Sequence, residues 1–201
     1  WWNGGLRIAG YSEVCEARLR LVQAQLAKFT KQEFPVTRTS GAQRGPSTYP
    51  LQLVNWYGGR GGHVSFSPAM PADGRLVQEQ FERTRRRYIE HGLDYSGTFY
   101  NDGRACTNVN LIIYDRDDTE QKTRVDGLFR ALVADAKQQG YGEYRTHLSY
   151  MDEVAATFDF NDHALLRLNE RVKDLLDPNG VLAPGRNGIW PAAWRDRRGQ
   201  L

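Results

Sequence analysis

The segment YSGTFYNDGRACTNVNLIIY, residues 95–114, carries the clearest secondary-structure pattern of the chain. Residues 95–100 and 106–114 are rich in aromatic and β-branched types, which favour β-strands. The Asn-Asp-Gly triplet at 101–103 lies between them and supplies residue types that accept the positive φ of a tight antiparallel reversal. The segment therefore predicts a β-hairpin with positive φ in the triplet.

A strand and a helix are predicted immediately before the hairpin. Residues Gly61–Pro68 alternate in polarity and end at a proline, which is typical of a short strand. Side chains at helical spacing follow, and Gly92 marks the end of that helix. The expected apolar stripe of the helix consists of Val77, Phe81, Thr84 and Tyr88.

A second long helix and a short extended segment are predicted after the hairpin. Asp118 followed by Gln121 has the spacing of a capping box, and Gly140 has the place of a C-terminal stop. Residues Glu143–Leu148 are expected to be extended. The buried stripe of the helix consists of Val125, Leu128 and Leu132.

The order strand, helix, strand, strand, helix, strand predicts the fold class. It is the split βαββαβ layout, an antiparallel sheet covered on one face by helices. The chain is therefore expected to be α+β and ferredoxin-like.

Two further helices are predicted near the ends of the chain. The first begins at Ser12, with Cys15 on its buried stripe as a small core residue. Residues 40–50 are expected to form a loop. The last helix ends where Asp177 precedes Pro178, because a residue before proline is pushed out of the helical region. Its apolar face consists of Leu165, Leu168, Val172 and Leu175.

Composition excludes several classes of protein. Of 201 residues, 40% are hydrophobic and 25% charged, which is typical of a globular domain and not of a disordered chain. The net charge of +3 does not by itself imply a polyanion partner, and no apolar run approaches the roughly twenty residues of a membrane span. Two cysteines cannot form a disulfide framework or a multi-thiolate zinc site. Because the chain starts at Trp1 with no leader pattern, we expect a piece of a longer protein.

Polar residues that packing does not require are the candidates for chemistry. The cluster Arg83, Arg85, Arg86 and Arg87 favours a solvated helix face over a phosphate-binding patch. His63 follows two glycines that let a flat ligand approach, although a lone histidine is more often structural.

Two other candidates suit an anion. Tyr144 and Arg145, followed by His147, place a hydroxyl and a guanidinium where both can donate to one anionic oxygen. The turn-rich loop Asp177–Pro191 presents Arg186 after a Pro-Gly turn, and a rigid loop of this kind holds a cation still.

Taken together, these segments resemble a known family. Gly61–Pro68, Tyr141–Leu148 and Asp177–Pro191 are similar to the C-terminal half of the vanillyl-alcohol oxidase family, which includes eugenol oxidase and para-cresol methylhydroxylase. The resemblance covers nearly the whole chain, and the proline-glycine loop is its most specific part. It implies an FAD enzyme that oxidises 4-alkylphenols or 4-hydroxybenzyl alcohols, with hydride transfer from the benzylic carbon to FAD N5 through a quinone methide.

The resemblance also implies roles for individual residues. His63 matches the histidine that binds the 8α-methyl group of FAD covalently, and Tyr144 with Arg145 matches the pair that binds the phenolic oxygen. Arg186 matches a cation beside the flavin pyrimidine edge, and Asn187 next to it is expected to bind the cofactor as well. The positions expected to line the substrate cavity are Ser65, Thr98 and Tyr100.

The sequence departs from the family in two respects. Thr107-Asn108 replaces a pair of histidines found in several members, so a proton-handling role of that pair is in doubt here, because asparagine does not titrate. The FAD-binding N-terminal half has no counterpart in the chain, so the chain alone is not expected to turn over. We expect residues 1–140 to be the substrate-binding cap and residues 141–201 to be a C-terminal segment that packs back on the FAD-binding domain.

The resemblance further implies a homodimer, with dioxygen or a cytochrome c subunit as electron acceptor, and a phenolic small molecule as substrate. No nucleic-acid or membrane partner is expected, and the cytoplasm is the default compartment. Two alternatives remain open: a catalytically silent lobe used for subunit contacts, and an RNA-recognition-like module, because the split βαββαβ frame also occurs in RNA-binding domains.

Overall fold

The computed structural model describes residues 4–38, 52 and 55–198, so the loop expected at 40–50 lies outside the described residues. The chain divides into two compact units, Trp1–Pro46 and Ser47–Leu201. The first unit contains α1 (Ser12–Leu26), none of whose residues is buried. Cys15 is only half-buried, so the prediction of a core cysteine is wrong: among residues 4–38, none buries the apolar stripe of α1.

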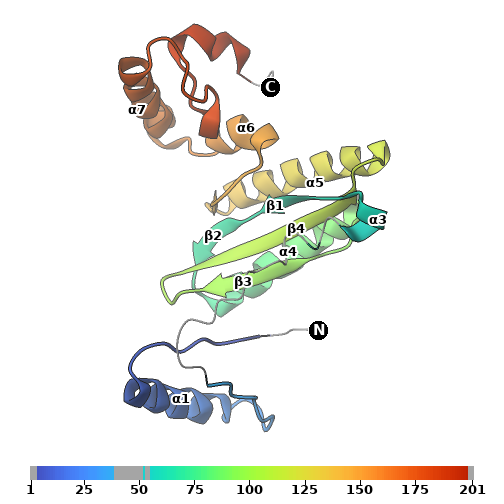
Figure 1. The fold of residues 1–201 in the computed structure, drawn as a ribbon, viewed down its shortest axis with the longest axis vertical. Coiled ribbons are helices and arrows are strands. Elements are labelled where there is room, and N and C mark those ends of the chain that lie inside the picture. Colours follow the sequence, from blue (N-terminus) through green and yellow to red (C-terminus); the bar gives the residue numbers. More distant parts are fainter. Residues whose placement is uncertain (1–3, 39–51, 53–54, 199–201) are drawn as a thin grey trace. The chain divides into compact units, whose positions relative to one another are not determined.

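One antiparallel sheet organises the second unit (Figure 1). Strands β1 (Gly61–Phe66) and β2 (Pro68–Pro71) pair with the same strand, β4 (Ala105–Asp115), in one continuous register. They are therefore a single strand interrupted at Ser67. β3 (Gly97–Asn101) also pairs with β4, and the two-residue β5 (Gly142–Glu143) pairs with β2. This is the predicted split βαββαβ arrangement.

The predicted hairpin is present as β3 and β4, but its turn differs from the prediction. Gly103 has a φ of 87°, whereas Asn101 and Asp102 keep negative φ. The side chain of Asn101 accepts a hydrogen bond from the backbone N–H of Gly103 at 2.8 Å, and that of Asp102 accepts from Arg104 and Ala105. These side chains stabilise the reversal by capping its backbone, so they need no left-handed conformation.

Both long helices begin at an aspartate cap. Asp73 accepts hydrogen bonds at the start of α4 (Gly74–Glu90), and Asp118 accepts from the N–H of Gln121 at 2.9 Å at the start of α5 (Thr119–Gln138). Gln121 does not complete a capping box, because its side-chain oxygen accepts from the N–H of Asp115. α5 ends before Gly140, which has a φ of 71° as expected for a C-terminal stop.

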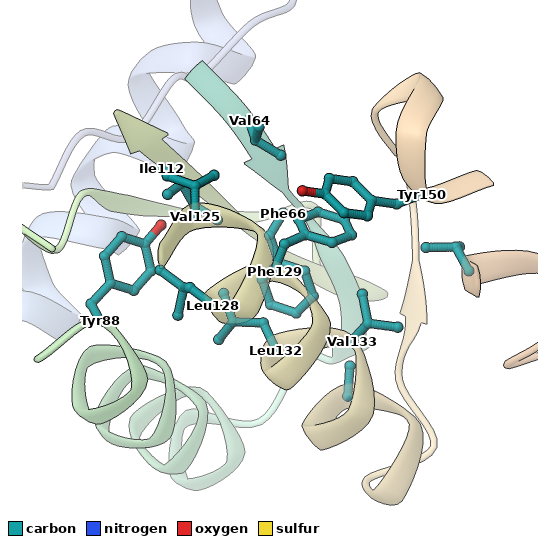
Figure 2. Packing of buried hydrophobic residues seen from close by; sticks show 12 residues of the cluster. Val64, Phe66, Tyr88, Ile112, Val125, Leu128, Phe129, Leu132, Val133 and Tyr150 are labelled. Atoms are coloured by element: carbon teal, nitrogen blue, oxygen red, sulfur yellow. The ribbon is translucent and has the colours of Figure 1, made fainter. Parts of the chain in front are cut away.

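The hydrophobic core lies between the sheet and these two helices (Figure 2). Phe129 of α5 meets Phe66 of β1 edge-on at 6.1 Å and stacks on Tyr150 at 4.0 Å between ring centroids. Val64 and Ile112 are directly opposite each other in the sheet and are buried with them. We call this side, which carries Val64, Phe66 and Ile112, the helix-covered face.

Short elements follow β5. The extended segment expected at Glu143–Leu148 is wrong beyond its first residue, because Glu143 ends β5 and a 3-10 helix, η2, starts at Leu148. The element bounds are α3 (Trp56–Gly59), η2 (Leu148–Tyr150), α6 (Met151–Ala155), α7 (Phe160–Leu176), η3 (Arg186–Gly188) and η4 (Ala192–Arg197).

The last helix, α7, ends as predicted at Leu176, and the carboxylate of Asp177 accepts hydrogen bonds from the N–H groups of Val181 and Leu182. Its predicted apolar side chains are exposed: Leu165, Leu168, Val172 and Leu175. In the described part of the chain, no helix is both long and apolar enough to span a bilayer.

Candidate functional site

Four of the predicted site residues lie on one side of the sheet. Directly opposite residues of an antiparallel pair point to the same face. His63 and Ser65 of β1 are opposite Ile113 and Leu111 of β4, positions that alternate with the buried Ile112. Thr98 and Tyr100 of β3 are opposite Val109 and Thr107 of the same strand. The face that carries His63, Ser65, Thr98 and Tyr100 is opposite to the helix-covered face, and we call it the open face.

The middle of the open face is apolar. Val109, Leu111 and Ile113 form a half-buried row along β4, while Asn108 and Asn110 on the helix-covered face are fully buried. Because Val64, Phe66 and Ile112 face the helices, apolar side chains lie on both faces of the sheet. The row is absent from the residues that the sequence analysis singled out, although Asn and aliphatic residues alternate over 108–111.

The Thr107-Asn108 pair is divided between the two faces. Thr107 is on the open face, opposite Tyr100. Asn108 is on the other face, where its side-chain oxygen accepts hydrogen bonds from Gln80 at 3.3 Å and Asn110 at 3.0 Å. Asn108 therefore belongs to the buried polar network under the helices, and of this pair the open face presents Thr107.

The structure brings His63 and Arg145 together. His63 is exposed, and its pKa is lowered by partial desolvation and then by the nearby positive charges of Arg145 and His147. A depressed pKa keeps the imidazole neutral at neutral pH, which leaves one ring nitrogen with a free lone pair. Within the described residues, the guanidinium of Arg145 is exposed and has no carboxylate partner at ion-pair distance.

Tyr144 is anchored through its backbone rather than its side chain. Its N–H donates to the carbonyl of Ser67 at 3.0 Å, which fixes the chain beside the break between β1 and β2. The side chain is 68% exposed. The backbone of Tyr144 is thus held beside the strand of His63, while its side chain is largely exposed to solvent.

Arg186 lies in a separate loop that is firmly attached to α6. The N–H of Asn187 donates to the sulfur of Met151 at 3.2 Å, and the indole N–H of Trp190 donates to Asp152 at 2.7 Å. Gly188 has a φ of 71°, and an added Cβ would lie 2.4 Å from the Cβ of Ala155. The loop therefore needs glycine at this position.

A hollow of about 660 Å³ lies beside this loop. Arg186 lines it together with Leu148 and Ser149 of η2, the element that directly follows the segment with Tyr144 and Arg145. The guanidinium of Arg186 is exposed, and Asn187 beside it is exposed as well. The structure therefore places Arg186 at a hollow next to η2, with Asn187 beside it in the chain, rather than on the open face.

The arginine cluster of α4 is largely a solvated face, as predicted. Arg85 and Arg86 are exposed, and Arg87 is half-buried in a bidentate ion pair with Asp135 of α5, at 2.8 and 2.9 Å. The Asp135 carboxylate raises the pKa of Arg87. Arg87 thus joins the two helices.

Comparison with known proteins identifies the class. The family "FAD linked oxidases, C-terminal domain" matches residues 6–187, so the chain belongs to it. The resemblance to the C-terminal half of the vanillyl-alcohol oxidase and para-cresol methylhydroxylase group, and the predicted α+β fold, are confirmed.

Individual relatives agree with this assignment. The chain is 30% identical over 200 residues to the 4-cresol dehydrogenase [hydroxylating] flavoprotein subunit of Pseudomonas putida, covering 94% of this chain and 37% of that protein. A crystal structure of p-cresol methylhydroxylase with substrate bound is similar with a TM-score of 0.74 and 28% identity, over 91% of this chain and 37% of that chain.

A third relative is the 4-ethylphenol oxidase from Gulosibacter chungangensis in its isoeugenol complex. It has a TM-score of 0.68 and 37% identity, over 71% of this chain and 27% of that one. The chain thus spans between about a quarter and little more than a third of the length of these relatives.

Proposed function

We propose that this chain is the substrate-binding cap and C-terminal segment of a flavoenzyme that oxidises para-substituted phenols at the benzylic carbon. The observation that carries the proposal is the open face of the sheet. It combines an apolar row, Val109, Leu111 and Ile113, with His63 at one side and Arg145 near that histidine. An apolar surface with a few placed polar groups is typical of a site for a flat aromatic ligand.

The residues of the chain fit FAD. His63 is exposed and uncharged at neutral pH, as a nucleophile for a covalent bond to the 8α-methyl group must be. Arg186 is an exposed cation on a rigid loop, and we propose that it and Asn187 bind the pyrimidine edge of the ring. When bound, FAD supplies the hydride acceptor.

Tyr144 and Arg145 bind the phenolic oxygen of the substrate in this proposal. Two donors, one of them charged, favour the phenolate over the phenol and hold it in one orientation. The added electron density of the phenolate weakens the benzylic C–H bond. Ser65, Thr98 and Tyr100, all on the open face, surround the aromatic ring and its side chain.

The substrate supplies both the proton and the hydride that are removed in this reaction. The phenol loses its hydroxyl proton to solvent, and its benzylic carbon loses a hydride, which leaves a neutral quinone methide. Addition of water to that carbon, with a proton gained by the ring oxygen, gives a 4-hydroxybenzyl alcohol. Loss of a proton from the neighbouring carbon, with a proton gained by the same oxygen, gives a 4-alkenylphenol. Tyr144 and Arg145 stabilise the charge on the oxygen before hydride leaves.

In this proposal the enzyme is completed by the N-terminal half of the same protein and by partners. A FAD-binding half packs against residues 141–201 and the open face, and two copies of the whole assemble as a homodimer. Dioxygen or a cytochrome c subunit accepts the electrons. The exposed apolar side chains of α7 support such a covering domain, because a face of this kind is unfavourable in water.

The decisive experiment uses the complete flavoprotein without oxygen. Addition of 4-ethylphenol or vanillyl alcohol should bleach the flavin absorbance, whereas 4-methoxybenzyl alcohol, which cannot form a phenolate, should not. In the variant His63→Ala, acid precipitation should release flavin into the supernatant, while it should stay with the wild-type protein. Absence of bleaching by any 4-alkylphenol would sink the proposed function, and retention of flavin by the variant would remove His63 from it.

A further inference from the structure

Glu143 is a half-buried carboxylate to which the proposed chemistry gives no role. It ends β5 and directly precedes Tyr144 and Arg145. Both of its oxygens accept from the backbone N–H of Ser67, at 2.8 and 2.9 Å. Its pKa is raised to about 8 by burial, against the opposing effects of hydrogen bonds from the N–H groups of Ser67 and Arg145 and of the charge of Arg145.

The direction of the backbone groups explains why a side chain is needed at this point. Ser67, where the strand is interrupted, directs its backbone toward β5, since its carbonyl accepts from the N–H of Tyr144. Its N–H therefore faces β5 as well. The carboxylate of Glu143 takes the place of the missing ladder partner, and an unpaired N–H there would cost about 1–3 kcal/mol.

The same contacts tie together the two halves of the candidate site. Ser67 follows Ser65 and His63 on one strand, and its carbonyl accepts from the N–H of Tyr144 at 3.0 Å. Its N–H is bound by the side chain of Glu143. Because β5 has only two residues, these hydrogen bonds are a large part of what holds the segment with Tyr144 and Arg145 against the strand.

We infer that Glu143 is a positioning residue, whose side chain locks the Tyr144-Arg145 segment to the strand of His63 by binding the N–H of Ser67. The inference rests on the proposed function, because it assigns Glu143 to the geometry of that site. Reach of an acceptor oxygen, not negative charge, is the required property. The raised pKa agrees with this, since the group is largely uncharged at neutral pH.

The test compares four variants of the complete flavoprotein. Glu143→Ala removes the acceptor, Glu143→Asp keeps a carboxylate but is one methylene shorter, and Glu143→Gln keeps one acceptor oxygen at full length. Glu79→Ala, an exposed glutamate of α4, is the matched control. KM and kcat are measured with 4-ethylphenol, together with flavin content and amide hydrogen exchange at Ser67 and at residues 144–147.

Glu143→Ala and Glu143→Asp should lower kcat/KM at least about tenfold, mainly through KM, since a displaced binding group weakens an oriented complex. Both should speed amide exchange at Ser67 by a similar factor, with unchanged exchange in α5. The kcat/KM of Glu143→Gln should stay within about threefold of the wild-type value, and that of Glu79→Ala should equal the wild-type value. If Glu143→Ala does not fold, the inference is decided by which of Glu143→Asp and Glu143→Gln keeps the higher kcat/KM.

If Glu143→Asp keeps a higher kcat/KM than Glu143→Gln, negative charge is the required property and the inference is overturned. Unchanged KM and unchanged Ser67 exchange in the alanine or aspartate variant would overturn it as well. If the wild type does not oxidise phenols, the proposed function fails, whereas the exchange rates at Ser67 and residues 144–147 still decide the role of Glu143.

Discussion

The two faces of the sheet are made from the same strands, yet they differ in where polar side chains lie. On the helix-covered face, β4 contributes Asn108 and Asn110 beside Ile112, all fully buried. On the open face, the same strand contributes the aliphatic Val109, Leu111 and Ile113. Apolar side chains thus lie on both faces and two amides are buried under the helices, although a sheet with one solvated face normally keeps its polar residues on that face.

Hydrogen bonds make the buried asparagines tolerable. The side chain of Asn110 donates to the carbonyl of Phe66 at 3.1 Å and to the side chain of Asn108 at 3.0 Å, and Gln80 of α4 also donates to Asn108. The aliphatic row on the open face has no such explanation within the described chain. An exposed aliphatic row is expected where another domain and a flat ligand cover the surface. The difference between the two faces therefore supports the proposed function.

The strongest way to test the difference is to remove the centre of the helix-covered face. Phe129→Ala should lower the free energy of unfolding by about 3–5 kcal/mol, because it leaves a cavity between Phe66 and Tyr150. Urea denaturation of the complete protein measures this loss. Lys122→Ala, an exposed position of the same helix, is the control and should change the value by less than about 0.5 kcal/mol. A loss under 1 kcal/mol for Phe129→Ala would mean that the core is not built as described.

Much of the fold follows from local patterns in the sequence. The hairpin, the caps Asp118 and Gly140, and the end of α7 before Pro178 depend on neighbouring residues, so they could be predicted. The resemblance to a family also could be read from short segments. The burial of Cys15 was wrong because it depends on what packs against α1, which its periodicity does not contain.

The site was predictable only in part, for the same physical reason. Ser65, Thr98 and Tyr100 were expected to line the substrate cavity and His63 to bind the flavin. The four residues share the open face, and their roles stay predictions. The choice of face for Asn108 and for the row at 109–113 depends on long-range packing and hydrogen bonding. The role inferred for Glu143 depends on a strand interruption 76 residues earlier in the chain. The local alternation of residues 108–111 shows that two faces exist but not which of them the helices cover, and the role of Glu143 has no local signal.

The pair Thr107 and Asn108 gives a sharper test, since neighbouring residues belong to different faces. Asn108→Ala should lower the free energy of unfolding by about 1–3 kcal/mol, because Gln80 and Asn110 lose their acceptor. It should leave KM for 4-ethylphenol within about twofold. Thr107→Ala should change KM for 4-ethylphenol and leave the free energy of unfolding almost unchanged. Urea denaturation and steady-state kinetics on both variants measure this, and an effect of Asn108→Ala on KM alone would contradict the assignment of faces.

The smallest expected effect concerns pH and the junction between the faces at Glu143. Its pKa is raised from 4.5 to about 8 in the folded protein, so between these values the folded state binds more protons than the unfolded state. Stability must then fall as pH rises from about 5 to 9, and because the carboxylate is partly solvated we expect about 1–2 kcal/mol from this group. The wild type and Glu143→Gln should be compared by urea denaturation across this range. The amide does not titrate, so the variant should lose that part of the slope, and an identical slope in both proteins would show that Glu143 is already ionised below pH 5.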